Sequence, residues 1–208
     1  EFVAIVGPSG SGKSTLMRVL LGFEKPEVGT VRLDGKDIET LDPRAVRRQM
    51  GVVLQTAGLL PGDIFTNIVG ARDLSMDDAW EAVRIAGLED EIRALPMQMH
   101  TFIAEGAATI SGGQRQRLLI ARAVAGRPRI LVFDEATSAL DNRTQAEVSR
   151  AIGHLRATRI VIAHRLSTVR HADRIVVLDG GQIVQSGPFD ELMNMPGPFQ
   201  DLARRQLV

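Results

Sequence analysis

Residues 1–15 read EFVAIVGPSGSGKST, and this stretch decides the fold class. Residues 2–6 form a short continuous apolar run, which is typical of a buried parallel strand. Residues 7–15 fit the pattern G-x-x-x-x-G-K-[S/T], and a helix-forming stretch of residues 13–21 follows directly. The glycines let the backbone curl so that successive N–H groups point into one concavity, a geometry that binds anions. The stretch therefore predicts a phosphate-binding loop between a strand and a helix.

The residue types in this loop suit a nucleoside triphosphate and Mg²⁺. Lys13 supplies a mobile positive charge for the β- and γ-phosphates, and the Ser14 hydroxyl can ligate Mg²⁺. The N-terminus of the helix adds the positive end of its dipole. The alternative is an ordinary glycine- and serine-rich turn between a strand and a helix. The residues predicted to hold the nucleotide here are Gly7, Pro8, Ser9, Gly10, Ser11, Gly12, Lys13, Ser14 and Thr15.

A second apolar run ends in two carboxylates. Residues 130–133 predict a strand, and Asp134 and Glu135 follow at its carboxyl end, where open α/β sheets bind ligands. Asp134 would orient Mg²⁺ through its water shell, and Glu135 would polarise an attacking water. Taken alone, the pair would be a solvated strand end.

The rest of the chain alternates between strand-like and helix-like periods, which predicts an α/β fold with a mainly parallel sheet. Residues 30–38 add a small antiparallel portion around an Asp-Gly turn, and residues 55–125 predict a helical insertion. Asp42-Pro43 predicts one helix start, and Ser75 with Asp78 predicts a capping box. The other expected strands are residues 52–54, 160–163 and 175–178.

Length and composition narrow the function classes. At ~150 residues per domain, 208 residues predict one domain, which can consist of two lobes. The 25 Lys and Arg balance the 25 Asp and Glu, so nothing points to nucleic acid as a partner. The chain has no cysteine, which excludes disulfides and a thiolate nucleophile. No apolar run approaches the ~18 residues that span a bilayer, so we expect no direct bilayer insertion.

A second glycine-rich helix start lies roughly a hundred residues after the first. Ser111, Gly112, Gly113 and Gln114 precede a helix-forming stretch to residue 125, and such an N-terminus can offer amides to an anion. One nucleotide can scarcely touch both helix starts within one chain, so the pattern favours two copies packed head to tail. The alternative is a serine-capped helix after a flexible loop.

With these motifs the chain resembles the ATP-binding cassette (ABC) ATPase, the nucleotide-binding domain of ABC transporters, over nearly its whole length. Gln55 follows the strand of residues 52–54 where the family's Q-loop glutamine lies. Residues 138–141 resemble the D-loop, and residues 163–168 resemble the switch-histidine segment around His164. Taken alone, Gln55 would be an exposed loop residue, His164 a strand terminus and Asp141 a helix N-cap.

The resemblance implies a P-loop NTPase (RecA-like) fold and a set of site residues. The catalytic residues would be Glu135, His164, Lys13 and Gln55, and the Mg²⁺ ligands Ser14, Gln55 and Asp134. Beyond the first loop, ATP would also be contacted by Ser111, Gly112, Gly113, Gln114 and Asp141. Residues 101–114 resemble the pattern T-x-V-G-E-x-G-x-x-L-S-G-G-Q of exporter members of the family. One departure is that Ala104 and Ala107 replace two glycines of this pattern.

The resemblance further implies an ATPase of exporter type that dimerises on ATP and powers export through a transmembrane domain, at the cytoplasmic face of the inner membrane. Residues 1–54 and 126–208 would form the nucleotide-binding core lobe, and residues 55–125 the helical lobe. The chain has no tyrosine, and Phe2 lies too close to the loop to stack on adenine. We therefore expect an upstream part of the domain, and the membrane domain, to lie outside this sequence.

Several alternatives remain. An ABC importer subunit has the same motifs. A non-transport ABC ATPase would carry tandem cassettes or a long coiled coil, which this stretch lacks. A small-molecule kinase or a GTPase would not need residues 111–114. A catalytically silent cassette is disfavoured because Glu135 and His164 are both present.

Overall fold

The computed structural model describes residues 1–104, 110–134, 136, 139–163 and 165–206. The described chain forms two compact units. Unit 1 consists of Glu1–Arg47 and Thr158–Val208, and unit 2 consists of Arg48–Ala157. These units are defined by packing, and the lobe boundaries expected at residues 54 and 125 stay a prediction.

Unit 1 is built on four strands in the order β10-β9-β1-β8. The central strand β1 (Phe2–Val6) pairs in parallel with β8 (Thr158–Ile162) and with β9 (Arg174–Asp179). The edge strand β10 (Gln182–Gly187) is antiparallel to β9 and returns through the two-residue turn Gly180-Gly181. Both turn glycines have positive φ, as a tight hairpin turn requires.

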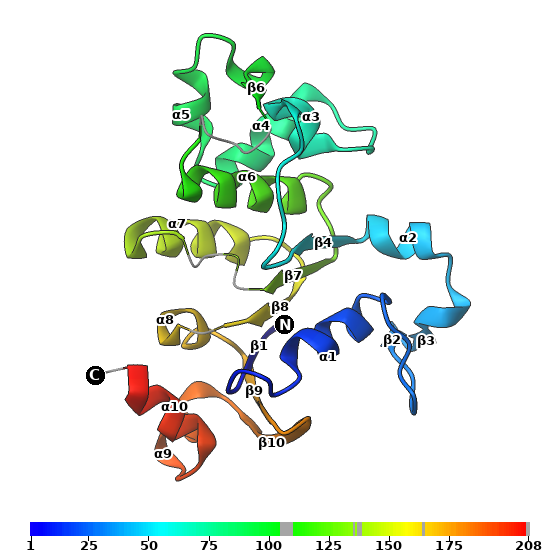
Figure 1. Ribbon diagram of the computed structural model, residues 1–208, viewed down its shortest axis with the longest axis vertical. Helices are drawn as coiled ribbons and strands as arrows, with labels where there is room; N and C mark the ends of the chain where they lie inside the picture. Colours follow the sequence, from blue (N-terminus) through cyan, green and yellow to red (C-terminus); the bar gives the residue numbers. More distant parts are fainter. Residues whose placement is uncertain (105–109, 135, 137–138, 164, 207–208) are drawn as a thin grey trace. The chain divides into compact units, whose positions relative to one another are not determined.

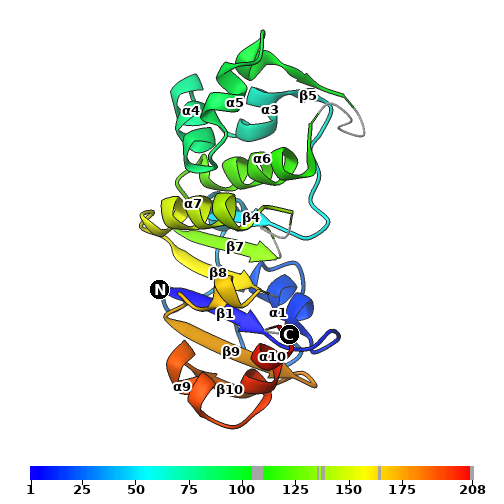
Figure 2. The same cartoon turned by 90° about the vertical axis from the view of Figure 1, so that its left-hand side faces the viewer.

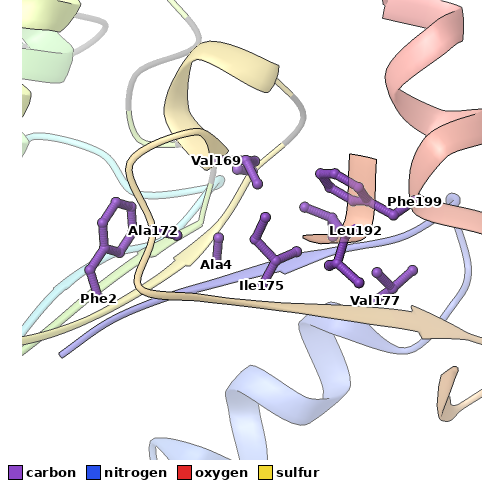
Figure 3. Packing of buried hydrophobic residues seen from close by; sticks show 10 residues of the cluster. Phe2, Ala4, Val169, Ala172, Ile175, Val177, Leu192 and Phe199 are labelled. Atoms are coloured by element: carbon purple, nitrogen blue, oxygen red, sulfur yellow. The ribbon is translucent and has the colours of Figure 1, made fainter. Parts of the chain in front are cut away.

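The two faces of this sheet are covered by different helices (Figures 1 and 2). Helix α1 (Lys13–Leu20) lies on one face. On the other face lie α8 (Leu166–Val169), α9 (Phe189–Asn194) and α10 (Pro198–Gln206). Alternate residues of β1 and β9 point into this second layer, as the period of two in a strand requires. The buried cluster there includes Phe2, Ala4, Val169, Ala172, Ile175, Val177, Leu192 and Phe199 (Figure 3).

The periphery of unit 1 follows the turn residues of the sequence. Strands β2 (Arg32–Leu33) and β3 (Lys36–Asp37) form the expected antiparallel hairpin around Asp34-Gly35. A 3₁₀ turn (η1, Ile38–Thr40) and helix α2 (Pro43–Arg48) follow in sequence. The Asp42 carboxylate accepts the Arg44 N–H at 3.0 Å, which confirms the predicted start of α2.

Unit 2 has a parallel strand pair, β4 (Met50–Val53) and β7 (Ile130–Asp134). Helix α6 (Gly112–Val124) packs on β4. Gly51 permits this close approach, because a Cβ there would lie 2.1 Å from the Ala123 carbonyl oxygen. The short pair β5 (Gly62–Asp63) and β6 (Phe102–Ile103) is antiparallel.

The remaining helices of unit 2 are α3 (Ile64–Val69), α4 (Met76–Ile85), α5 (Glu89–Arg93), the 3₁₀ turn η2 (Gln98–His100) and α7 (Asn142–Gly153). Of these, α3 and α4 pack on α6 (Figure 2). Helix α4 begins with the predicted capping box. Ser75 Oγ accepts the Asp78 N–H, and the Asp78 carboxylate accepts the Ser75 N–H at 2.9 Å.

The predicted α/β class with a mainly parallel sheet and a helical insertion is confirmed. The expected strands occur at β1, β4, β7, β8 and β9, with ends that differ by up to two residues. Strand β10 was not predicted. Its two apolar residues, Ile183 and Val184, are 63% and 44% exposed, so it lacks the buried apolar run by which the other strands were found. Among the described residues, no helix combines the length and apolarity needed to cross a membrane.

Candidate nucleotide-binding site

The phosphate loop of unit 1 has a backbone that only glycine allows at its first position. Gly7 has φ +153°, and a Cβ there would lie 2.0 Å from the Leu178 carbonyl oxygen. On the far side of the loop, the Gly181 N–H donates to the Ser11 carbonyl at 3.2 Å. The β9–β10 hairpin therefore supports the loop through this hydrogen bond and through its close approach to Gly7.

The start of α1 is left available to a ligand. Gly12 is the N-cap in the left-handed conformation, and no side chain caps the helix. By contrast, the starts of α3, α4, α6 and α7 are each capped by a side chain. The first-turn N–H groups of a helix have no partner within the helix, so an anion can bind here. Ser14 and Thr15 are exposed at this end.

Lys13 lies across its own loop. Its Nζ donates to the carbonyls of Gly7 (3.0 Å) and Pro8 (2.7 Å) and to Ser11 Oγ (3.4 Å), and the residue is only 6% exposed. A phosphate group entering the loop would replace neutral acceptors by charged oxygens, and such charge-assisted bonds are about twice as strong. The loop is therefore a cradle of the right chemistry for a triphosphate.

Unit 2 gathers three of the other predicted residues around one cavity of about 240 Å³. Gln55 enters from the loop after β4, Gly112 from the start of α6, and Asp134 from the end of β7. Asp134 is 7% exposed. The amide oxygen of Gln55 and the carboxylate oxygens of Asp134 are hard donors of the kind Mg²⁺ prefers. Among the described residues, no three His, Cys, Asp or Glu side chains gather as a metal cluster.

The start of α6 is a complete capping box. Ser111 Oγ accepts the Gln114 N–H at 3.1 Å, and Gln114 Oε1 accepts the Ser111 N–H at 2.9 Å. This arrangement is the serine-capped helix that the sequence left open as an alternative. It also leaves the hydroxyl hydrogen of Ser111 as a donor, because the capping bond uses only the oxygen as an acceptor.

Residues 111–114, here called the signature segment, are anchored to the neighbouring helix α5. Gln114 Nε2 and Arg117 Nη1 both bond the Glu91 carboxylate at 2.7 Å, and Arg117 also donates to the Gly87 carbonyl. Burial opposes the charge on Glu91, but the hydrogen bonds from Gln114 and Arg117, with the charge of Arg117, lower its pKa. The residues of the box are thus held before any ligand binds.

Asp141 begins α7. Its carboxylate accepts the N–H groups of Arg143 and Thr144 at 3.0 Å and the Thr144 hydroxyl at 2.6 Å, and these hydrogen bonds, led by the hydroxyl, lower its pKa. The sequence named this N-cap as the alternative, and the contact with ATP stays a prediction. Just before it, the Ala139 N–H donates to Gln116 Oε1 at 2.7 Å, which ties this loop to α6.

The described residues place some of the predicted site and not all of it. Of the unit 2 residues, Ser111, Gly113, Gln114 and Asp141 do not line the cavity that Gln55, Gly112 and Asp134 share. Glu135 and His164 lie outside the described residues, as do Ser138, Ala107 and the rest of residues 105–109. The sequence motifs do not reveal two supports, the β9–β10 turn next to the phosphate loop and Arg122 on α6. The Gly-Gly pair after an apolar strand is the signal that predicts the first of these.

The cradle, the open helix start and the buried Asp134 at a strand end define a P-loop nucleotide-binding domain. The chain belongs to the ABC transporter family, whose profile matches residues 1–138. It is therefore an ABC-type ATP-binding and ATP-hydrolysing domain, as predicted.

Similar proteins from several organisms agree with this assignment. The alpha-hemolysin translocation ATP-binding protein HlyB of Escherichia coli O157:H7 is 47% identical over 197 residues, which are 93% of this chain and 28% of HlyB. ABC transporter B family member 14 of Arabidopsis thaliana is 44% identical over 206 residues, covering 98% of this chain and 16% of that protein. The mycobactin import ATP-binding/permease protein IrtB of Mycolicibacterium thermoresistibile is 42% identical over 206 residues, covering 98% and 36%.

Among solved structures, a bacterial Atm1-family ABC exporter with ATP bound superposes with a TM-score of 0.94 at 38% identity, covering 100% of this chain and 37% of the exporter. This match confirms the predicted fold and the similarity to exporter-type members. The chain spans between 16% and 37% of the length of these four proteins.

Proposed function

We propose that this chain is the ATPase domain of a membrane transporter of exporter type, and that two copies close head to tail on ATP. The observation that carries the proposal is the pairing of an open phosphate loop in unit 1 with a preformed signature segment in unit 2. The first can bind a triphosphate alone. The signature segment presents a hydroxyl and glycine amides, and these donors suit it to cover ATP that is bound to the phosphate loop of a second copy.

The proposed roles follow the general chemistry of phosphoryl transfer, in which positioning and charge dominate. The loop amides and Lys13 hold the phosphates. Ser14, Gln55 and Asp134 would supply oxygen ligands for Mg²⁺, and the ion when bound neutralises charge on the phosphate oxygens. Ser111, Gly112 and Gly113 close the pocket from the second copy.

Two further roles fall on residues outside the described part of the chain. Glu135 orients the attacking water, and His164 contacts the γ-phosphate. Gln114 and Asp141 support the signature segment and the D-loop. Hydrolysis removes the charge that joins the two copies, so they separate.

The proposed partner in the membrane is a transmembrane domain, which places this chain at the cytoplasmic face. Unit 2 exposes Leu60, Met97 and Phe102 at 69%, 62% and 62%, and all three lie in or next to β5, η2 and β6. Exposed large apolar side chains are the kind that a protein partner covers. The lobe division at residues 54 and 125 belongs to this proposal, with the partner on the helical lobe.

Import is the second candidate direction, because IrtB is named as an import protein at 42% identity. The ATPase cycle described above is the same for either direction. Reconstituting the full transporter in vesicles and measuring which way the cargo moves distinguishes the two.

The head-to-tail proposal is tested by the dependence of hydrolysis on protein concentration. Specific ATPase activity should rise with concentration, because each site needs two copies. Glu135→Gln should bind ATP, stop turnover and accumulate a dimer on size exclusion. Constant specific activity over the whole concentration range, with a monomeric Glu135→Gln protein, would overturn it.

A further inference from the structure

Asn67 is a buried polar residue that holds the segment after Gln55. It is 4% exposed and lies in α3. Its Oδ1 accepts the Leu60 N–H at 2.9 Å, and its Nδ2 donates to the carbonyls of Leu60 (2.8 Å) and Asp63 (3.1 Å). Both backbone groups of Leu60 are therefore fixed by one side chain, although the Leu60 side chain itself is 69% exposed.

Arg122 of α6 completes this arrangement. Its Nε donates to the Asn67 carbonyl at 2.7 Å, Nη2 to Asn67 Oδ1 at 2.8 Å, and Nη1 to the Gly58 carbonyl at 3.0 Å. A guanidinium is the side chain suited to this, because its donors form a planar fork of fixed geometry. The fork thus joins α6, α3 and the loop of residues 54–61, and α3 packs beside α6 (Figure 2).

Arg122 is held by dipoles and not by a carboxylate. Within the described part of the chain neither Arg122 nor its neighbour Arg72 makes an ion pair, and Arg72 Nη2 donates to the Arg122 carbonyl at 2.7 Å. Burial lowers the pKa of both, and the charge of Arg72 lowers that of Arg122 further. Both arginines are partly buried, and the hydrogen bonds that Arg122 makes offset its loss of water and fix the carbonyl of Gly58 in the loop.

The brace adds a fixed point to the loop that carries Gln55, in which the Ala57 N–H already donates to the Leu54 carbonyl at 3.0 Å. Val53 is fixed in the sheet by its pairing with Phe133, and Gly58 is fixed by Arg122. Residues 54–57 are the span between these points. Without the brace the span would extend over residues 54–61, to the start of β5. Each doubling of a free loop makes a given placement of its residues about threefold rarer.

We propose that Asn67 and Arg122 form a brace that positions Gln55 and makes its loop move as one body with the signature helix α6. Ser111 and Arg122 lie near opposite ends of this helix, about 16 Å apart at 1.5 Å per residue. Gln55 and Gly112 share the cavity at one end, and the brace grips the loop at the other. Asn67 and Arg122 are positioning residues, and their role in turnover rests on the proposed function.

Hydrogen exchange of the 208-residue chain without nucleotide tests the brace directly. Asn67→Ala and Arg122→Lys are compared with Arg117→Lys, a matched change on the same helix whose bonds go to Glu91 and Gly87. Losing one hydrogen bond should speed exchange of the Leu60 amide by about fivefold in Asn67→Ala. Arg122→Lys keeps the charge but not the fork, and it should speed exchange across residues 57–60. Arg117→Lys should leave this segment unchanged.

Asn67→Asp covers the case in which Asn67→Ala does not fold. It keeps the acceptor for Leu60 and Arg122 and loses the two donors, so it should show a smaller increase in exchange. Equal exchange of residues 57–60 in wild type, Arg122→Lys and Asn67→Asp would overturn the brace.

Steady-state ATP hydrolysis, with ATP affinity measured separately, tests the positioning role. Arg122→Lys should lower kcat by about threefold, while the Kd for ATP stays unchanged because the phosphate loop belongs to unit 1. A double change with Asn67→Asp should cost little more than either change alone. If kcat of Arg122→Lys equals that of the wild type, the positioning role is wrong although the proposed function stands. If the wild type binds no ATP, the proposed function fails and the exchange result still decides the brace.

Discussion

Ser111 and Ser75 are two serines with the same structural role and different proposed functions. Both begin helices of unit 2 with a full capping box, and their Oγ atoms accept the N–H of the third residue at 3.1 and 3.2 Å. Replacing a serine N-cap by alanine costs about 1 kcal/mol of stability. Ser111→Ala should therefore lose about 1 kcal/mol of unfolding free energy, and Ser75→Ala at least as much, because the Ser75 hydroxyl also donates to the Asp78 carboxylate at 2.6 Å.

Their effects on hydrolysis should differ. Against a typical stability of 5–15 kcal/mol, a loss of about 1 kcal/mol leaves nearly every molecule folded. Ser75→Ala should therefore hydrolyse ATP at close to the wild-type rate. Ser111→Ala also removes a hydroxyl donor to a charged phosphate, a bond worth about 1.5–3 kcal/mol. Its kcat/KM should fall by roughly tenfold to about a hundredfold.

Two measurements on the same samples suffice. Urea unfolding followed by Trp80, the only tryptophan, gives the stability of each variant, since Trp80 lies in α4 under the Arg93 guanidinium at 4.2 Å. Phosphate release gives the rate. Ser111→Thr keeps the hydroxyl and should retain most of the activity. Equal rates for Ser111→Ala and Ser75→Ala would refute the proposed contact with phosphate.

Three further predictions rest on other contacts. Gly7→Ala should abolish ATP binding, measured by titration calorimetry, because its Cβ would collide with the Leu178 carbonyl. At Gly10 a Cβ meets no atom, so Gly10→Ala should cost only the ~1–2 kcal/mol of backbone energy that an alanine needs in the left-handed conformation. Gly51→Ala should destabilise the fold by about 1–3 kcal/mol in urea through its clash with Ala123, and Gly58→Ala, which has open space, should not. Hydrogen bonds from Arg84 and Arg93 lower the pKa of Glu89 from 4.5 to about 2. The stability that this carboxylate contributes is therefore present above pH 4.5 and is lost as the pH falls toward 2. Glu89→Gln should flatten that part of an acid unfolding curve.

The sequence predicted the elements whose signals are local. Buried strands showed as apolar runs, and the starts of α2, α4 and α6 showed as caps, including Asp78 in the place usual for glutamate or glutamine. Strand β10 had no such run, because an edge strand packs on one side only and its apolar residues are exposed. The Gly-Gly turn before it was the available signal.

Local sequence patterns do not predict hydrogen bonds between side chains that lie far apart in the sequence. From the sequence alone, the arginines of α6 (Arg115, Arg117 and Arg122) predict a mixed solvent face with salt bridges. Arg117 does pair with Glu91, but for Arg122 the expectation is wrong, since it donates to backbone carbonyls and to Asn67, 55 residues away. A helical pattern shows that a residue lies on a partly buried face, but the acceptors there depend on how a distant loop folds.

The two glycine-rich helix starts are not equivalent, and the difference bears on the order of events in the proposed cycle. The start of α1 has no side-chain cap, so the N–H groups of its first turn can donate to an anion. At α6 the capping box uses the N–H groups of Ser111 and Gln114, which leaves the amides of Gly112 and Gly113 and one hydroxyl. The second site is therefore the weaker anion binder of the two. ATP should bind the phosphate loop first, and the signature segment should join only once the γ-phosphate is fixed there. It follows that Ser111→Ala should leave the Kd for ATP of the monomer unchanged while turnover falls, and a parallel loss of both would show that α6 takes part in the first encounter.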